Sequence, residues 1–93
     1  MPVEVTNNKA ASRYELSVDG DLIGIADYQI DGDAIVFPHT EITPAKRGQG
    51  YGAILVRQAL DDVRRSGASV VPHCWFVADF IRENPGYANL LAA

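Results

Sequence analysis

The sequence Lys46-Arg47-Gly48-Gln49-Gly50-Tyr51-Gly52 is the most informative part of this chain. Three glycines alternate there, directly before a segment with the periodicity of an amphipathic helix. Two cations precede that helix, although the helix dipole favours acids at this end, and the first acid is Asp61. A bound anion would remove the unfavourable charge arrangement, because backbone N–H groups beside glycine and a guanidinium together form a phosphate site. The sequence therefore predicts an anion-binding loop.

The segments around the loop predict a β-α-β unit. After the loop, apolar residues recur at helical spacing, and they are Leu55, Val56, Ala59, Leu60 and Val63. Gly67 is the expected C-terminal cap of this helix. Residues 68–72 are interpreted as a short buried strand, which a right-handed crossover would lay parallel beside the strand before the loop. A second helix is expected over residues 76–84 and should end at Pro85-Gly86.

Upstream of the loop, alternating apolar and polar residues predict antiparallel strands. Residues 13–18 have the pattern of a half-buried strand, and Asp19-Gly20 supplies the left-handed backbone of a two-residue hairpin turn. The next strand covers about residues 22–30, where Gly24 marks a bulge or a close approach. A turn at residues 31–33 follows. A short strand near residues 3–5 is also compatible with the pattern.

The third long strand, residues 34–42, runs directly toward the glycine loop. Strict alternation puts Val36 and Thr40 on one face and the following side chains on the other: Ile35, Phe37, His39 and Glu41. Pro38 has no N–H to donate, so we expect irregular pairing there. Together these elements predict an α+β fold, an antiparallel strand meander completed by a β-α-β unit and a C-terminal helix.

The composition restricts the class of protein. The 93 residues allow a single domain, 1–93, of ordinary globular composition. A net charge of −4 argues against nucleic acid or an anionic membrane as partner, so the local positive site suits one small anionic ligand. The apolar runs are too short to span a bilayer, and no signal peptide opens the chain. Cys74 is the only cysteine, so no disulfide can form within the chain, which indicates a reducing cytoplasm. One cysteine and two histidines in separate segments are too few ligands, and too far apart in the sequence, for a typical zinc site.

Two known nucleotide-binding motifs fit the loop poorly. Gly48, Gly50 and Ala53 satisfy a loose dinucleotide-binding pattern, but residues 43–46 separate the strand from the glycines. The next strand ends at His73-Cys74 rather than at an acid, and the chain is too short for a doubly wound sheet. No Gly-Lys-Ser/Thr of a Walker loop follows. A flexible glycine loop without a ligand is the remaining alternative.

The spacing Arg47-x-x-Gly50-x-Gly52, after a strand and before a helix, resembles the acetyl-CoA pyrophosphate loop of the GCN5-related N-acetyltransferases. The resemblance extends over residues 39–91 through further motifs in the right order: His39-Thr40-Glu41-Ile42, Pro72-x-Cys74 and Asn84-Pro85-Gly86-Tyr87. It is closest to the small members that keep only the cofactor-binding part of the fold. Residues 1–38 match only as a strand meander.

The resemblance implies how acetyl-CoA or coenzyme A would lie. The backbone of Ile42 and Thr43 would pair with the pantetheine arm as an added strand does. The pyrophosphate would be wrapped by the loop residues Lys46, Arg47, Gly48, Gln49, Gly50, Tyr51 and Gly52. The three glycines would then be small because a side chain would hold the phosphates away from the backbone.

Cys74 is the first catalytic candidate that the resemblance implies, since it would lie near the acetyl thioester. Many larger relatives use a tyrosine of the following helix as general acid for the departing thiolate, whereas Ile81 and Arg82 occupy that stretch here. In the small subgroup a cysteine recurs at this point and is suspected of acid or acyl-carrier chemistry. The alternative is a small buried core residue.

Glu41 and His39 are the other catalytic candidates. Acetyltransferases often keep a general base at the end of the central strand, where Glu41 stands, to deprotonate the incoming ammonium. The alternative for Glu41 is a solvated carboxylate, and His39 would either share the base role or pack. Trp75, Phe76 and Phe80 are expected in the core or as walls of the cofactor site, because no basic residues interleave them as in a nucleic-acid platform.

The resemblance implies an N-acetyltransferase that moves an acetyl group from acetyl-CoA to an amine, either a small molecule or a peptide lysine. Larger relatives carry further N-terminal helices that help to build the acceptor site. The acceptor cleft is therefore expected to be open or completed by another subunit of an oligomer. The alternatives are a module that binds CoA or acyl-CoA without turnover and an interaction domain with a vestigial loop.

Overall fold

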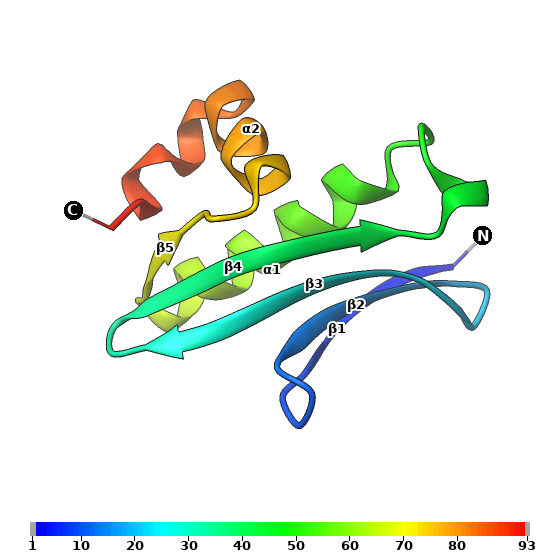
Figure 1. Ribbon diagram of the computed structural model, residues 1–93, viewed down its shortest axis with the longest axis horizontal. Helices are drawn as coiled ribbons and strands as arrows, with labels where there is room; N and C mark the ends of the chain where they lie inside the picture. Colours follow the sequence, from blue (N-terminus) through cyan, green and yellow to red (C-terminus); the bar gives the residue numbers. More distant parts are fainter. Residues whose placement is uncertain (1, 93) are drawn as a thin grey trace.

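The computed structural model describes residues 2–92 as one mixed five-stranded sheet that curls around a long helix (Figure 1). The strand order follows the sequence, with β1 (Val3–Asn8), β2 (Arg13–Val18), β3 (Asp21–Asp31), β4 (Ala34–Ile42) and β5 (Ser69–Val71). β1 to β4 are antiparallel, whereas β5 lies parallel to β4. The predicted α+β class and the parallel last strand are confirmed. β1 is longer and β5 shorter than predicted.

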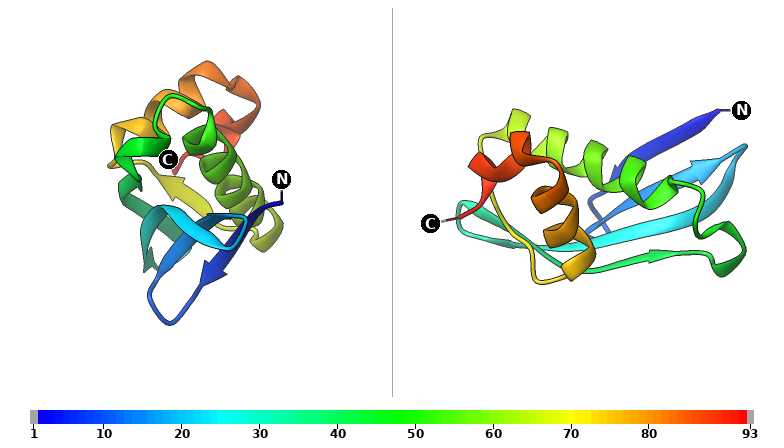
Figure 2. Two further views of the ribbon diagram at one scale, coloured as in Figure 1. Left: turned by 90° about the vertical axis from the view of Figure 1, so that its right-hand side faces the viewer. Right: turned by 90° about the horizontal axis from the view of Figure 1, so that it is seen from above.

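Two α-helices complete the fold, α1 (Tyr51–Ser66) and α2 (Trp75–Glu83), with 3-10 turns at Pro44–Lys46 and Pro85–Leu90. The long α1 contacts all five strands, and α2 contacts α1 and β4 (Figure 2). Gly67 caps α1 with a φ of 81° and donates its N–H to Arg64, as expected. α2 begins one residue earlier than predicted. No helix within residues 2–92 is long and apolar enough to cross a membrane.

The hydrophobic core lies between α1 and the concave face of the sheet. All five apolar positions predicted for α1 are buried. The largest fully buried side chains come from β2, β4, α1, β5 and α2: Leu16, Phe37, Leu55, Val56, Leu60, Val70 and Val77. α1 is thus held firmly along its length, and its N-terminus is a fixed point from which a site can be built.

The Asn84-Pro85-Gly86-Tyr87 motif attaches the C-terminal segment to α1. The Tyr87 ring is contacted by the guanidinium groups of Arg57 and Arg64, at 5.8 and 5.2 Å from its centroid. Its hydroxyl donates to Asp61 at 2.7 Å. These contacts hold α2, which ends where this motif begins, against the middle and the C-terminal half of α1.

Irregular pairing near the middle of the sheet was predicted and is found at two places. Leu16 pairs with Gly24 while Ser17 pairs with Leu22, so Ile23 is the extra residue of a bulge directly beside Gly24. A Cβ at Gly24 would come within 2.6 Å of Ile42 Cδ1, so a close approach occurs there as well. The hairpin turn at Asp19-Gly20 has the expected positive φ angles, 51° and 86°.

The second irregularity corrects the predicted faces of β4. Asp27 pairs with His39 and Gln29 with Val36, so one β3 residue faces two residues of β4 at Pro38. Such a bulge shifts the alternation of the bulged strand by one residue. Phe37 is 1% exposed in the core, whereas His39 and Glu41 are exposed. The prediction that Phe37 shares a face with His39 and Glu41 is therefore wrong.

β4 and β5 separate soon after they pair. Their ladder covers only Ala34–Val36 of β4, and the last link is the N–H of Cys74, which donates to the Phe37 carbonyl at 2.7 Å. Beyond that point, the edge of β4 has no neighbouring strand among residues 2–92. The opening between the two strands leads to the glycine loop.

Candidate cofactor site

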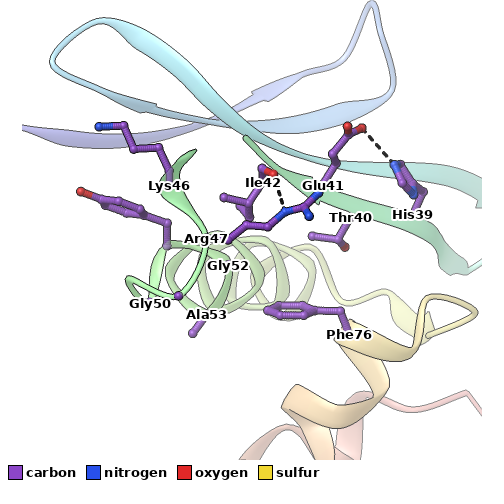
Figure 3. A pocket seen from close by; sticks show the side chains of 12 residues that line it. His39, Thr40, Glu41, Ile42, Lys46, Arg47, Gly50, Gly52, Ala53 and Phe76 are labelled. Atoms are coloured by element: carbon purple, nitrogen blue, oxygen red, sulfur yellow. Dashed lines mark hydrogen bonds and ion pairs between the residues drawn. The ribbon is translucent and has the colours of Figure 1, made fainter. Parts of the chain in front are cut away.

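A cleft of about 610 Å³ lies between the end of β4, the glycine loop, the start of α1 and the first turn of α2 (Figure 3). Most of the predicted site residues line it: His39, Glu41, Ile42, Lys46, Arg47, Gly48, Gly50, Tyr51 and Gly52. Phe76, which was expected in the core or as a wall of the cofactor site, also lines it, and so do Thr40 and Ala53, which were not predicted. Thr43, Gln49 and Cys74 lie outside this cleft.

The loop end of the cleft has the backbone conformation that an anion-binding site needs. Gly48 and Gly50 have φ angles of 78° and 84°, which favour glycine, and Gly50 is the N-cap of α1. No side chain caps this helix, and no acid lies in its first turn. The first backbone N–H groups of a helix have no partner within it. At the start of α1, Tyr51, Gly52 and Ala53 line the cleft, and their N–H groups have no acceptor outside the helix among residues 2–92. A phosphate group would supply an acceptor for them and the negative charge that the helix dipole favours.

Two cations lie beside these N–H groups. Arg47 donates its Nε to the Ile42 carbonyl at 3.1 Å, which holds the guanidinium over the cleft. Its two terminal nitrogens bond to no residue of the described chain, and Lys46 forms no ion pair with residues 2–92. Gln49 instead turns back and donates to the Ala45 carbonyl at 3.5 Å, so its side chain braces the loop.

The edge of β4 offers different backbone groups from those expected. Thr43 donates its N–H to Ile23 at 2.7 Å, and its carbonyl accepts the N–H of Lys46 at 2.8 Å. Its N–H is therefore not free to pair with an added strand, contrary to the expectation for Thr43. Because successive strand residues direct their backbone groups to opposite edges, Ile42 and Thr40 present theirs to the cleft. Ile42 was predicted in this role, whereas Thr40 was missed.

Gly52 is small for a reason that the sequence did not reveal. A Cβ at this position would lie 2.6 Å from Cζ of Phe76, so the glycine makes room for that ring. The expectation that Gly52 is small for the sake of a phosphate stays a prediction, and this contact adds a second reason for glycine. Phe76 is 44% exposed and forms an apolar wall of the cleft. Of the two places expected for Phe76, the core or a wall of the site, the structure thus gives a wall of this cleft.

His39 and Glu41 form a pair on β4. His39 Nε2 lies 3.2 Å from Glu41 Oε2, and Figure 3 shows both side chains directed away from α1. Their side chains are 54% and 56% exposed, so the pair adds little to stability. An imidazole and a carboxylate at this distance can together accept and pass on a proton.

Cys74 is the N-cap of α2 and faces a second cleft. Its Sγ lies 3.6 Å from Thr40 Oγ1, and the side chain is partly buried against the core. Burial raises the pKa of the thiol, but hydrogen bonds from the Thr40 hydroxyl and from the backbone of Val77, Phe76 and Thr40 outweigh it. The net effect is a pKa of Cys74 below its usual value.

The second cleft, of about 500 Å³, adjoins the first. It is lined by Pro38, His39, Thr40, His73, Cys74, Trp75, Phe76 and Asp79, and it shares His39, Thr40 and Phe76 with the first cleft. Trp75 is 78% exposed at its rim, so this residue is not part of the core, whereas Phe80 is buried as expected. No group of three His, Cys, Asp or Glu residues within residues 2–92 is arranged to hold a metal ion.

Comparison with known proteins identifies the family. The family model described as GCN5-related N-acetyl-transferase matches residues 13–90, most of the chain. The chain therefore belongs to the GCN5-related N-acetyltransferases.

Individual proteins resemble this chain in sequence or in fold. Protein NATD1 of Bos taurus is 29% identical over 86 residues, which cover 90% of this chain and 76% of that protein. A GCN5-like protein of Staphylococcus aureus has the same fold, with a TM-score of 0.74 at 16% identity over 97% of this chain and 88% of its own. A family member from Brucella melitensis, solved in complex with acetyl-CoA, gives a TM-score of 0.60 at 22% identity over 69% of this chain. The match spans only 47% of that protein, about half its length.

Proposed function

We propose that this protein binds acetyl-CoA in the main cleft and transfers the acetyl group to an amine. The observation that carries the proposal is the combination, in one cleft, of an uncapped helix N-terminus, two cations and an uncovered strand edge. A pyrophosphate with an extended amide-bearing arm requires these three features. The family and its member in complex with acetyl-CoA support the same ligand.

In this proposal the diphosphate lies at the N-terminus of α1, against Arg47 and Lys46. The pantetheine arm extends along β4 and pairs with the backbone of Ile42 and Thr40. The apolar ring of Phe76 covers the other side of the arm. The thioester then lies near the region that both clefts share, between Thr40 and Cys74.

The reaction follows from the groups around that region. The amine nitrogen forms a bond to the acetyl carbonyl carbon, and the bond between that carbon and the sulfur of CoA breaks. The proton lost by the amine passes to the pair formed by Glu41 and His39. The departing sulfur takes a proton from the Cys74 thiol, whose lowered pKa makes it a better donor. The products are the acetylated amine and coenzyme A.

Binding is tested by melting the protein with and without coenzyme A. A ligand that binds only the native state, at a concentration of 100 times its dissociation constant, stabilises it by about 2.7 kcal/mol. For a domain of this size, the expected rise in melting temperature is on the order of 10 °C. The absence of any rise at millimolar coenzyme A would remove the basis of the proposal.

Arg47→Ala is expected to weaken coenzyme A binding by about 1.5–3 kcal/mol, the range for a hydrogen bond to a charged group. The matched control is Arg65→Ala, which removes an exposed guanidinium from the opposite end of α1 and should leave binding unchanged. Isothermal titration measures both affinities. Equal affinities for the two variants would show that the diphosphate binds elsewhere.

One observation favours the alternative of a CoA-binding module without turnover. The side chains of Glu41 and His39 point away from α1 and are more than half exposed, so little fixes a base against the thioester. Mass spectrometry of an amine and peptide panel after incubation with acetyl-CoA separates the two functions. Coenzyme A binding without any acetylated product favours the module.

A further inference from the structure

We infer that the second cleft is the acceptor site and that it selects a primary ammonium group carried on a flexible alkyl arm, as in a lysine side chain. This inference rests on the proposed function, because it identifies the substrate that meets the acetyl group. Three observations carry it: the position of the cleft, the charge of its lining and its exposed aromatic ring.

The position of the cleft suits an acceptor. It meets the main cleft at His39, Thr40 and Phe76, where the proposed thioester lies, and Cys74 lines it. A molecule in the second cleft would thus reach the thioester without crossing the glycine loop. His39, with Glu41 at 3.2 Å, stands at the boundary between the two clefts and can take the proton of an arriving ammonium.

The lining of the second cleft is complementary to a cation. Its titratable lining consists of the imidazoles of His39 and His73, the thiol of Cys74 and one carboxylate, that of Asp79, whose side chain is 36% exposed. No lysine or arginine is among the described residues that line it. Asp79 is bonded to Arg82 at 2.7 Å, three residues along α2. Because the Arg82 side chain is 71% exposed, this pair is weak and another cation can exchange with it.

The exposed aromatic ring completes the arrangement. Trp75 is the most exposed large apolar side chain of residues 2–92, at 78%. It lies four residues before Asp79, so both side chains fall on the same face of α2. Tryptophan is the strongest aromatic partner of an ammonium, and a carboxylate beside it adds direct charge attraction. An anionic or uncharged acceptor would gain neither interaction.

Trp75 is the sole tryptophan of the chain, so its fluorescence reports directly on this cleft. In the presence of coenzyme A, which cannot donate an acetyl group, the protein is titrated with Nα-acetyl-lysine amide. Its uncharged counterpart, Nα,Nε-diacetyl-lysine amide, is titrated in parallel. We expect a saturable change in fluorescence with the first probe and binding at least about 10-fold weaker with the second, given the magnitude of cation–π and carboxylate contacts.

Two variants of α2 should change this affinity in opposite directions. Asp79→Asn is expected to weaken binding of the cationic probe about 5-fold or more, and Arg82→Ala to strengthen it by releasing the carboxylate. Asp33→Asn, at an acid in the distant turn between β3 and β4, is the matched control and should change nothing. Equal binding of the two probes, or an unchanged affinity in Asp79→Asn, would overturn the inference. The melting shift with coenzyme A, measured on the same samples, shows separately whether the proposed function holds.

Discussion

Cys74→Ser is expected to lower the rate of acetyl transfer by at least about 100-fold, the lower end of the effect of a general acid or base. A hydroxyl has nearly the size of a thiol, but its far higher pKa makes it a poor proton donor to a departing thiolate. The lowered pKa of Cys74 and its contact with Thr40 at 3.6 Å are the structural reasons for this expectation. Because Cys74 lies outside the main cleft, the melting shift with coenzyme A should persist.

A purely structural role for Cys74 predicts a different pattern. Cys74 packs partly against the core, so a structural role would lower the melting temperature of Cys74→Ser and leave the rate per folded molecule unchanged. Thr40→Val is the companion variant, since it removes a group that lowers the thiol pKa. Alkylation of this single cysteine should be half-maximal below the usual thiol pKa of about 8.5 in the parent and at higher pH in Thr40→Val. An acetyl group retained on Cys74 in the intact protein would instead indicate an acyl carrier.

Local sequence patterns predicted most of the fold. The helical spacing from Leu55 to Val63 matches the buried face of α1. Gly67 ends that helix because glycine adopts the left-handed backbone of a C-terminal cap without strain. The structure contains the predicted two-residue turn at Asp19-Gly20 and the predicted strand of residues 34–42. Both depend only on residues that are close together in the sequence: the turn on its two central residues, and the strand on the alternation of its side chains. The preference of β-α-β units for a right-handed crossover then predicted β5 parallel and adjacent to β4, as found.

The errors arise where two distant segments meet. A bulge at Pro38 changes which side chains of β4 share a face, and pairing with β3 determines where that bulge lies. The sequence showed that Pro38 would disturb the ladder, but not that the alternation would shift after it. Thr43 donates to Ile23, twenty residues earlier, and that bond removes its N–H from the predicted site.

The half of the candidate site for which we propose anion binding was predictable as a structure, although its role stays a prediction. Helix polarity, glycine conformation and the charges of Lys46 and Arg47 are properties of one continuous segment, and the structure brings that segment into the main cleft. The apolar wall formed by Phe76 depends on the docking of α2 against α1. The sequence offered two places for Phe76, the core or a wall of the site, and only this docking decides between them. The sequence therefore indicates which ligand to test more readily than which side chains surround it.

Leu60→Ala is expected to lower the free energy of unfolding by about 2–5 kcal/mol, as for other large-to-small changes in a core. Leu60 is fully buried at the centre of α1, the helix that contacts every strand of the sheet. For a domain of this size, the loss corresponds to a fall in melting temperature on the order of 10–30 °C. Leu22→Ala, at an apolar position that is 47% exposed, is the matched control and should cost well under half as much.

Leu60→Ala also tests whether coenzyme A binding depends on the packing of the core. The anion-binding groups lie at the N-terminus of α1, more than two helical turns from Leu60, and need only the native helix. Since coenzyme A would bind the native state alone, it should stabilise Leu60→Ala by the same free energy as the parent. Calorimetric melting of both proteins with and without coenzyme A measures this. A Leu60→Ala variant that stays folded but gains no stability from coenzyme A would mean that the cleft depends on the packing beneath α1, rather than on the loop and helix end alone.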